Sequence, residues 1–145
     1  MPSKSLLLTP AALQQDGPCI FVLISTTRYE FEEGTAVGLD FPQARVRALI
    51  DTGASITVIN PEVARSCKLR QTGIAQLVAA NSSGSYPEHA AAISFPDSEL
   101  KGFEAIKVVA CPIVRQPYSC LIGRDILRKW ALIYEGSKGR VSVQD

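Results

Sequence analysis

One short stretch of the chain combines residue types that could activate a water molecule. Asp51-Thr52-Gly53 follows the apolar residues 48–50 and precedes Ala54, Ser55 and the apolar run 56–59. Desolvation penalises a charged carboxylate at the end of such a run, although turn and helix-cap aspartates also occur at these positions. A carboxylate can accept a proton from water while a second carboxylate donates one to the group under attack. Asp51 is therefore a candidate for one carboxylate of such a pair.

Length and composition predict one compact domain. The chain has 145 residues, 46% of them hydrophobic, which is enough to bury a core without metals or disulfides. We expect residues 1–17 to form a flexible arm or an edge segment, and residues 18–145 to form the domain. The formal net charge of +1 and the lack of like-charge runs argue against a nucleic-acid partner. The apolar residues near the start are too interrupted for a signal peptide or a membrane span, so we expect a soluble, cytoplasmic protein with no membrane partner.

The cysteines and the single histidine argue against metal or triad chemistry. Cys19, Cys67, Cys111 and Cys120 are spaced too widely for a zinc knuckle or a redox turn. We expect buried free thiols, with a disulfide between the last two as the alternative in an oxidising compartment. His89 is the only histidine, which leaves too few zinc ligands and makes a Ser-His-Asp arrangement improbable. We therefore expect no metal and no organic cofactor.

The pattern of apolar and turn-forming residues predicts the elements that position Asp51. Strands are expected over 19–25, 35–39, 44–50, 103–109 and 120–122, and helices over 61–67, capped by Asn60, and over 124–130. Residues 74–80 and 89–95 should pair as a hairpin, because the turn formers of 81–87 lie between them. A second hairpin, made of 131–134 and 140–143, ends the chain. The predicted fold class is therefore mainly β.

A second motif repeats the layout of the first. Leu121-Ile122-Gly123 matches Leu49-Ile50-Asp51, with two apolar residues before a special position, and Arg124 then begins a helical segment. Gly123 lacks a side chain, which allows a close approach of the backbone where two loops cross. The two ordered motifs resemble those of the retropepsin-like aspartic proteases, and the resemblance extends from about residue 45 to residue 143.

The resemblance implies a fold, an activity and a set of site residues. The fold would be a closed β-barrel half with a flap hairpin and one short C-terminal helix, working as a homodimer. The activity would be hydrolysis of peptide bonds by a water held between two copies of Asp51. Thr52 would hold the two loops across the axis, Gly53 would offer its carbonyl to the substrate, and Gly123 and Arg124 would be structural. The substrate-binding residues would be Ala54, Val58, Leu77 and Ile122 in the pockets, and Asn81, Ser82, Ser83, Gly84, Ser85 and Tyr86 in the flap.

Two features leave alternatives open. Retroviral members commonly carry an acid where this chain has Ser55, so the sequence leaves the partner of Arg124 open, with Asp125 and Glu62 as candidates. The activity itself has two alternatives: a non-catalytic dimerisation or peptide-binding module that kept the fold, and a protease domain cut from a longer polyprotein. An intact Asp51 motif favours catalysis, since a binding module gains nothing from a buried pair of like charges.

Overall fold

A computed structural model describes residues 2–79 and 82–145 of the chain. Residue Asn81, expected in the flap, lies outside the described residues. The strands are β1 (Ser3–Leu7), β2 (Cys19–Ser25), β3 (Ala44–Ile50), β4 (Val58–Ile59), β5 (Arg70–Ala79), β6 (Ser82–Ser94), β7 (Phe103–Ala110), β8 (Cys120–Ile122), β9 (Ala131–Glu135) and β10 (Arg140–Gln144). The helices are α1 (Pro10–Asp16), α2 (Arg28–Ala36), α3 (Pro61–Ser66), α4 (Arg124–Leu127) and the 3₁₀ turn η1 (Gly136–Lys138).

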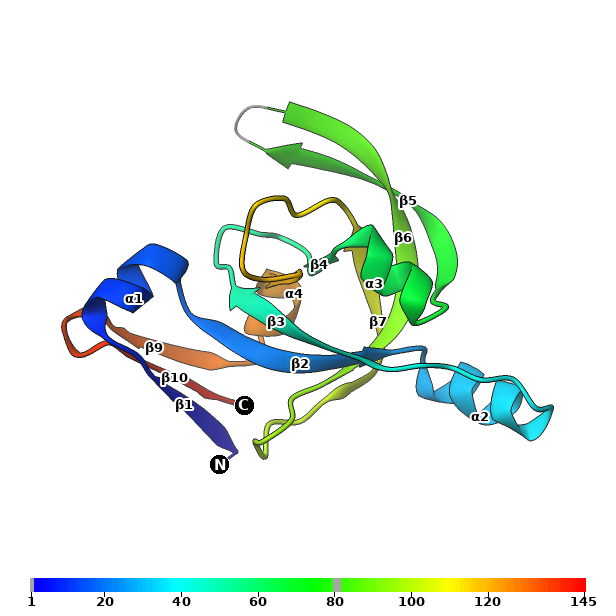
Figure 1. Cartoon of the computed structure of the whole chain (residues 1–145), viewed down its shortest axis with the longest axis horizontal. Coiled ribbons are helices and arrows are strands. Elements are labelled where there is room, and N and C mark those ends of the chain that lie inside the picture. Colours follow the sequence, from blue (N-terminus) through cyan, green and yellow to red (C-terminus); the bar gives the residue numbers. More distant parts are fainter. Residues whose placement is uncertain (1, 80–81) are drawn as a thin grey trace.

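Six strands close into a barrel. The larger sheet has the order β2-β3-β8-β4-β7-β6-β5, and β2 also pairs with β6, which joins the two sides of the sheet. Strand β6 makes this possible because it is long enough to pair with β5, β7 and β2 along its length. Within the described residues, β5 pairs only with β6, and the two form a hairpin that extends away from the barrel (Figure 1). The expected mainly β fold with a closed barrel is confirmed.

The barrel core follows the alternation of its strands. In β2, Ile20, Val22 and Ile24 are buried, whereas Phe21 between them is 47% exposed. Successive side chains of a strand point to opposite faces, so each strand gives one set of residues to the core. Phe95 and Trp130 close one end of the core with their rings edge to face, 5.0 Å apart between centroids.

The N-terminal segment packs on the domain. Strand β1 pairs antiparallel with β10, which pairs with β9, and together they form a second sheet at one end of the molecule, near both termini (Figure 1). Helix α1 starts at Thr9, whose side chain accepts a hydrogen bond from the Ala12 amide, and it buries Leu13. Leu6 and Val143 join the same core as the barrel. Within the described residues, β1 is therefore an edge strand of this sheet.

The strand predicted over 35–39 is wrong, because α2 occupies part of this segment. Thr27 caps the helix by accepting from the Glu30 amide at 3.2 Å, and Glu30 lies near the positive end of the helix dipole. Val37 and Leu39, which suggested a buried strand, are 76% and 56% exposed. Local capping therefore decides the structure of this segment, and the apolar residues follow it to the surface.

Three smaller differences affect the elements around Asp51. Helices α3 and α4 are shorter than predicted, although single turns extend α4 as far as Trp130. Asn60 is the N-cap residue of α3, but its side chain makes no capping hydrogen bond, because its Oδ1 accepts instead from the Ile113 amide at 2.6 Å. Residues 82–87, expected in the turn of the hairpin, belong to β6. The paired part of the hairpin is therefore longer than the sequence suggested.

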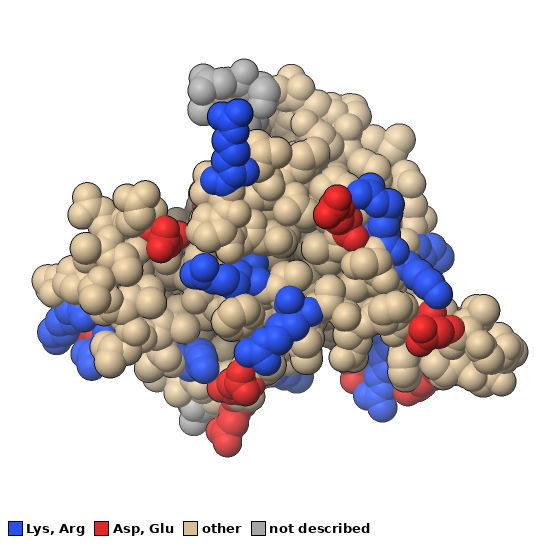
Figure 2. All heavy atoms as spheres, viewed as in Figure 1, with Lys and Arg blue, Asp and Glu red and all other residues tan. Residues whose placement is uncertain are grey.

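The surface carries both signs of charge. Lys and Arg are interspersed with Asp and Glu on the face shown in Figure 2. In the described part of the chain, no helix combines the length and the hydropathy needed to cross a membrane.

The packing of α1 gives a first test of the fold. Replacing Leu13, 1% exposed, with Ala should lower the free energy of unfolding by about 2–5 kcal/mol, because a cavity remains in the core. Leu7→Ala is the matched control, since Leu7 is 80% exposed and its loss should change stability by less than about 0.5 kcal/mol. Urea unfolding measures both. An unchanged midpoint for Leu13→Ala would mean that the segment does not contribute to the fold.

Candidate active site

The two motifs end side by side. Strands β3 and β8 are parallel neighbours with Ile50 opposite Ile122, so Asp51 and Gly123 follow at the same end of both strands. The Asp51 amide donates to the Ile122 carbonyl at 3.0 Å, which extends the ladder into the loop. The Ile50 amide donates to the Pro18 carbonyl at 2.8 Å on the other side. The backbone that carries Asp51 is thus held from both neighbouring segments.

The loop after β3 turns its carboxylate toward its own backbone. Asp51 Oδ1 accepts from the Gly53 amide at 2.9 Å, and the Ala54 amide donates to the Asp51 carbonyl at 3.2 Å. A Cβ on Gly53 would lie 3.1 Å from Asp51 Oδ1, which is tighter than ordinary contact. Asp51 is half-buried and both Thr52 and Gly53 are exposed. The turn therefore presents one carboxylate at an accessible position with a fixed orientation.

Gly123 lies where two loops cross. A Cβ at this position would be 2.5 Å from the Ile56 carbonyl carbon and 2.9 Å from the Thr57 amide nitrogen. Both are backbone atoms, so a side chain could fit only if the crossing segment moved. The Gly123 amide also donates to Thr57 Oγ1 at 3.2 Å. The missing side chain is needed for this contact.

Thr57 links the crossing to α4, and sequence reasoning missed it. Thr57 is fully buried, and its hydroxyl donates to Asp125 Oδ1 at 2.8 Å while its amide donates to Asp125 Oδ2 at 3.0 Å. Asp125 Oδ1 also accepts from the Ile126 amide at 2.9 Å, at the start of α4. One carboxylate thus joins the loop, the helix and, through the hydroxyl, Gly123. The available signal was a hydroxyl inside the apolar run 56–59, because a buried hydroxyl requires a partner.

Arg124 bonds to carbonyl groups of the Asp51 loop. Its amide donates to the Ala54 carbonyl at 2.8 Å, and its Nη1 donates to the Thr52 carbonyl at 2.7 Å. Neither expected partner is used, since Asp125 is bonded to Thr57 and Glu62 lies 3.8 Å from Arg65. The alternatives named from the sequence were therefore both wrong. Backbone oxygens supply the acceptors that the missing acid would have provided.

A cavity of about 320 Å³ opens beside Asp51. The barrel loops form one side and the β5–β6 hairpin forms the other. Of the residues predicted for the site, those that line this cavity are Asp51, Gly53, Ala54, Val58, Leu77, Gly84 and Tyr86. Its size falls within the range of pockets that bind small ligands or peptide side chains.

Other predicted residues lie elsewhere. Ile122 is fully buried in the barrel core, and Leu121 lines the cavity in its place, because neighbouring residues of β8 face opposite sides. Thr52, Ser83 and Ser85 are exposed and do not line the cavity. Ser85 Oγ instead pairs with the Gln76 amide group across the hairpin, at 2.6 Å.

The segment after β7 provides a wall that sequence reasoning missed. The missed lining residues are Ser55, Ile56, Val78, Cys111, Pro112, Ile113 and Leu121. The backbone of this segment is fixed by the Cys111 amide, which donates to the Ile59 carbonyl at 3.0 Å, and by the bond from Ile113 to Asn60. The segment after β7 reaches Asp51 only through the folding of the chain, so no local sequence pattern marks it as part of the cavity.

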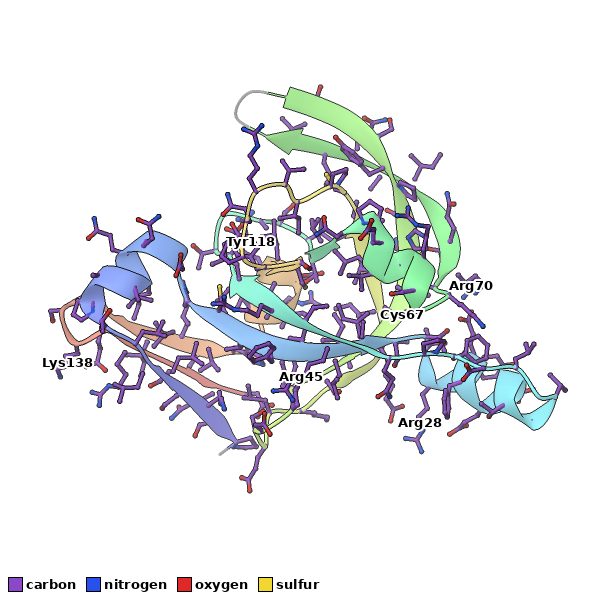
Figure 3. All side chains as sticks on the ribbon, in the orientation of Figure 1. Arg28, Arg45, Cys67, Arg70, Tyr118 and Lys138 are labelled. Carbon is purple, nitrogen blue, oxygen red and sulfur yellow. The ribbon has the colours of Figure 1, made fainter. Side chains whose placement is uncertain are left out.

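Two tyrosines lie near the cavity. The neighbouring Cys111 thiol raises the pKa of the Tyr86 hydroxyl. Burial raises the pKa of Tyr118, which is labelled in Figure 3. The negative charges of Cys19 and Asp51 raise this pKa further. Both hydroxyls therefore stay protonated at neutral pH. Among the described residues, no group of three or more His, Cys, Asp or Glu side chains could hold a metal ion.

The comparison with family models agrees with the two motifs. A family model described as "gag-polyprotein putative aspartyl protease" matches residues 38–129, which include both. Structural comparison matches the chain with the EIAV protease in complex with the inhibitor HBY-793, at 18% identity and a TM-score of 0.46, over 77% of this chain and 86% of that one. It also matches a retropepsin-like aspartic protease from Rickettsia conorii, at 16% identity and a TM-score of 0.47, over 87% and 91%. No curated protein matches the chain.

The Thr57 network can be tested by stability. Thr57→Val removes the hydroxyl while keeping the shape, so Asp125 loses a donor and the Gly123 amide loses its acceptor. We expect the free energy of unfolding to fall by about 1–3 kcal/mol, the usual effect of leaving buried polar groups unpaired. Thr72→Val, at an exposed strand position, is the control and should be nearly neutral. Equal midpoints for the two variants in a denaturant titration would contradict the network.

Proposed function

Because a family model matches most of its length, the chain belongs to the gag-polyprotein aspartyl protease family, and we propose that it is an aspartic endopeptidase active as a homodimer. The observation that carries the proposal is the position of Asp51. Its carboxylate lies at an accessible turn, on the wall of a cavity, where the two motifs meet. A turn aspartate with only a structural role would not need a cavity or a second motif.

The need for a second carboxylate supports the homodimer. Among the described residues that line the cavity, Asp51 is the only Asp or Glu. Hydrolysis of a peptide bond by this chemistry uses one carboxylate to take a proton from water and another to protonate the carbonyl oxygen. A twofold axis near Asp51 would supply the second from the partner copy. The two would share one proton and titrate as a unit.

The neighbours of Asp51 have supporting roles in this proposal. Thr52 is exposed next to Asp51 and is free to contact its symmetry mate. Arg124 holds the Thr52 carbonyl, so it fixes the loop on which such a contact depends. Gly53 lines the cavity, where its carbonyl can accept a hydrogen bond from the substrate backbone.

The cavity suggests which peptides would bind. An extended peptide between the β5–β6 hairpin and the barrel could form strand-like hydrogen bonds with its main chain. Its alternate side chains would point toward the walls, which include Val58, Leu77, Ile113 and Leu121. We therefore expect cleavage next to apolar side chains.

The shared carboxylates predict a specific result when subunits are mixed. Asp51→Asn should abolish cleavage of a diverse peptide library while the protein stays folded. When equal amounts of wild type and Asp51→Asn are refolded together, activity should fall to about one quarter of that of the all-wild-type sample, since random pairing leaves a quarter of dimers with both carboxylates.

Asp16→Asn is the matched control for that mixture, because Asp16 is exposed at the end of α1. Mixed with wild type, it should leave activity unchanged. Sedimentation of the same samples reports whether dimers form. Activity of one half in the Asp51→Asn mixture would indicate independent monomers, and full activity of Asp51→Asn alone would refute the mechanism.

A shared proton also predicts the pH profile. The free enzyme is active only when the pair holds one proton, so kcat/KM should rise and then fall as the pH increases from acid to neutral. Kinetic assays across this range measure it, and circular dichroism at each pH separates titration from acid unfolding. A single sigmoidal limb in folded protein would indicate that one carboxylate acts alone.

A further inference from the structure

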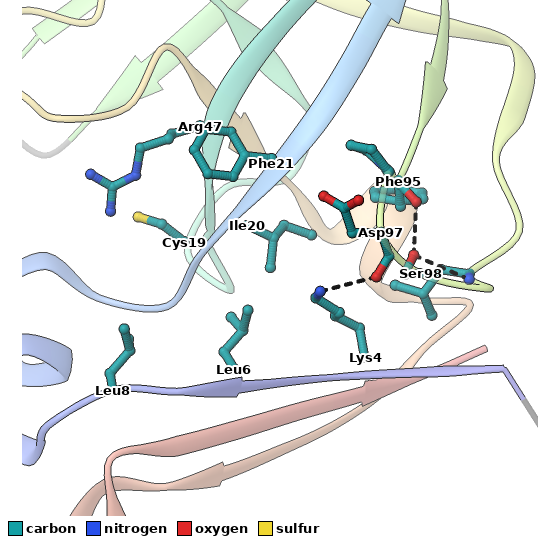
Figure 4. Close-up of a pocket in the computed structure, with 12 residues that line it drawn as sticks. Lys4, Leu6, Leu8, Cys19, Ile20, Phe21, Arg47, Phe95, Asp97 and Ser98 are labelled. Carbon is teal, nitrogen blue, oxygen red and sulfur yellow. Dashed lines mark hydrogen bonds between the residues drawn. The ribbon is translucent and has the colours of Figure 1, made fainter.

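A second cavity lies away from Asp51, between the terminal sheet and the barrel. Its volume is about 400 Å³, and it separates β1 from β2 and from the turn after β6 (Figure 4). Most of its wall is apolar and comes from Leu6, Leu8, Ile20, Phe21, Phe95 and Leu100. Leu6 projects from β1 toward Ile20 on β2, and Leu8 projects to the same side of the chain (Figure 4). The shape and chemistry suit a slender apolar group.

Two basic side chains give the cavity a positive charge. Lys4 and Arg47 line it, and within residues 2–79 and 82–145 neither forms an ion pair. Lys4 Nζ donates only to a neutral group, the Asp97 carbonyl, at 3.1 Å. The Asp97 carboxylate, the acidic group of the lining, is already paired with Arg45 at 3.1 Å. The cavity therefore has uncompensated positive charge beside an apolar wall.

We propose that this cavity binds an amphipathic carboxylate, a molecule with an unbranched apolar tail and one anionic head. The tail would lie between Leu6 and Ile20, where it would leave water, and the head would bond to Lys4. A neutral apolar ligand would leave the two cations without an anionic partner, and a cationic ligand would be repelled by them. Charge complementarity thus selects one class of ligand.

The position of the cavity gives such a ligand a structural effect. It would contact β1 of the terminal sheet and β2 of the barrel at the same time. A ligand that binds the folded chain and not the unfolded one raises the stability of the fold in proportion to the logarithm of its concentration. The occupied cavity should therefore strengthen the attachment of the terminal sheet, whether or not the chain is a protease.

Laurate is a suitable probe, used with the full chain at concentrations below those at which it forms micelles. We expect saturable binding by calorimetry, a thermal midpoint that rises with laurate concentration, and methyl NMR shifts confined to the cavity, at Leu6, Ile20 and Leu100. Methyl laurate and laurylamine have the same tail without the negative charge, and they should bind at least about tenfold more weakly, since a charge-assisted hydrogen bond is lost.

Variants of the chain complete the test. Lys4→Gln should weaken laurate binding about tenfold, whereas Arg128→Gln, which removes an exposed cation outside the cavity, should leave it unchanged. Equal binding of laurate and methyl laurate would overturn the proposal, as would undiminished binding to Lys4→Gln. Protection of the same methyl groups by dimerisation alone would assign the cavity to a second copy and would also overturn it. None of these measurements depends on peptide cleavage.

Discussion

The crossing of the backbone at Gly123 with the segment 56–57 is the contact on which the site depends. It brings the ends of β3 and β8 together and leaves no room for a side chain at Gly123. Thr57 and Asp125 hold the crossing from inside through three hydrogen bonds that satisfy a buried hydroxyl and a half-buried carboxylate. Arg124 holds it from outside through carbonyl groups of the Asp51 loop. The orientation of Asp51 is therefore determined by several short, mutually supporting contacts rather than by its own turn alone.

Much of the barrel was predictable because its strands have strong local signals. The run 19–25 and the run 44–50 are rich in β-branched and aliphatic residues, and both are strands with the expected bounds. The failure at 35–39 came from weighing apolar residues above the capping residue Thr27, eight positions earlier. Helix capping is a short-range effect, but its consequence extends through the whole helix. A prediction of secondary structure therefore has to weigh the apolar pattern together with the helix-capping residues upstream of it.

The sequence predicted only those site residues that belong to the two motifs themselves. Asp51, Gly53 and Gly123 lie where two loops meet, as the repeated motif indicated. Ile122 and Leu121 were exchanged, because the choice between faces of a three-residue strand depends on the register of its neighbours. The partner of Arg124 and the wall at 111–113 depend on the path of distant segments. Local sequence patterns do not indicate such long-range contacts.

The continuity of β6 has a mechanical consequence for the hairpin above the cavity. One strand, β6, runs from the hairpin, where it pairs with β5, to the barrel wall, where it pairs with β2, with a register shift between Ala91 and Ile93. Movement of the hairpin would therefore bend and twist a strand that also belongs to the barrel. Such bending is graded rather than all-or-none. A bulky bound molecule that displaced the hairpin would therefore strain β6 along its length. The pairing between β2 and β6 would shift together with the hairpin.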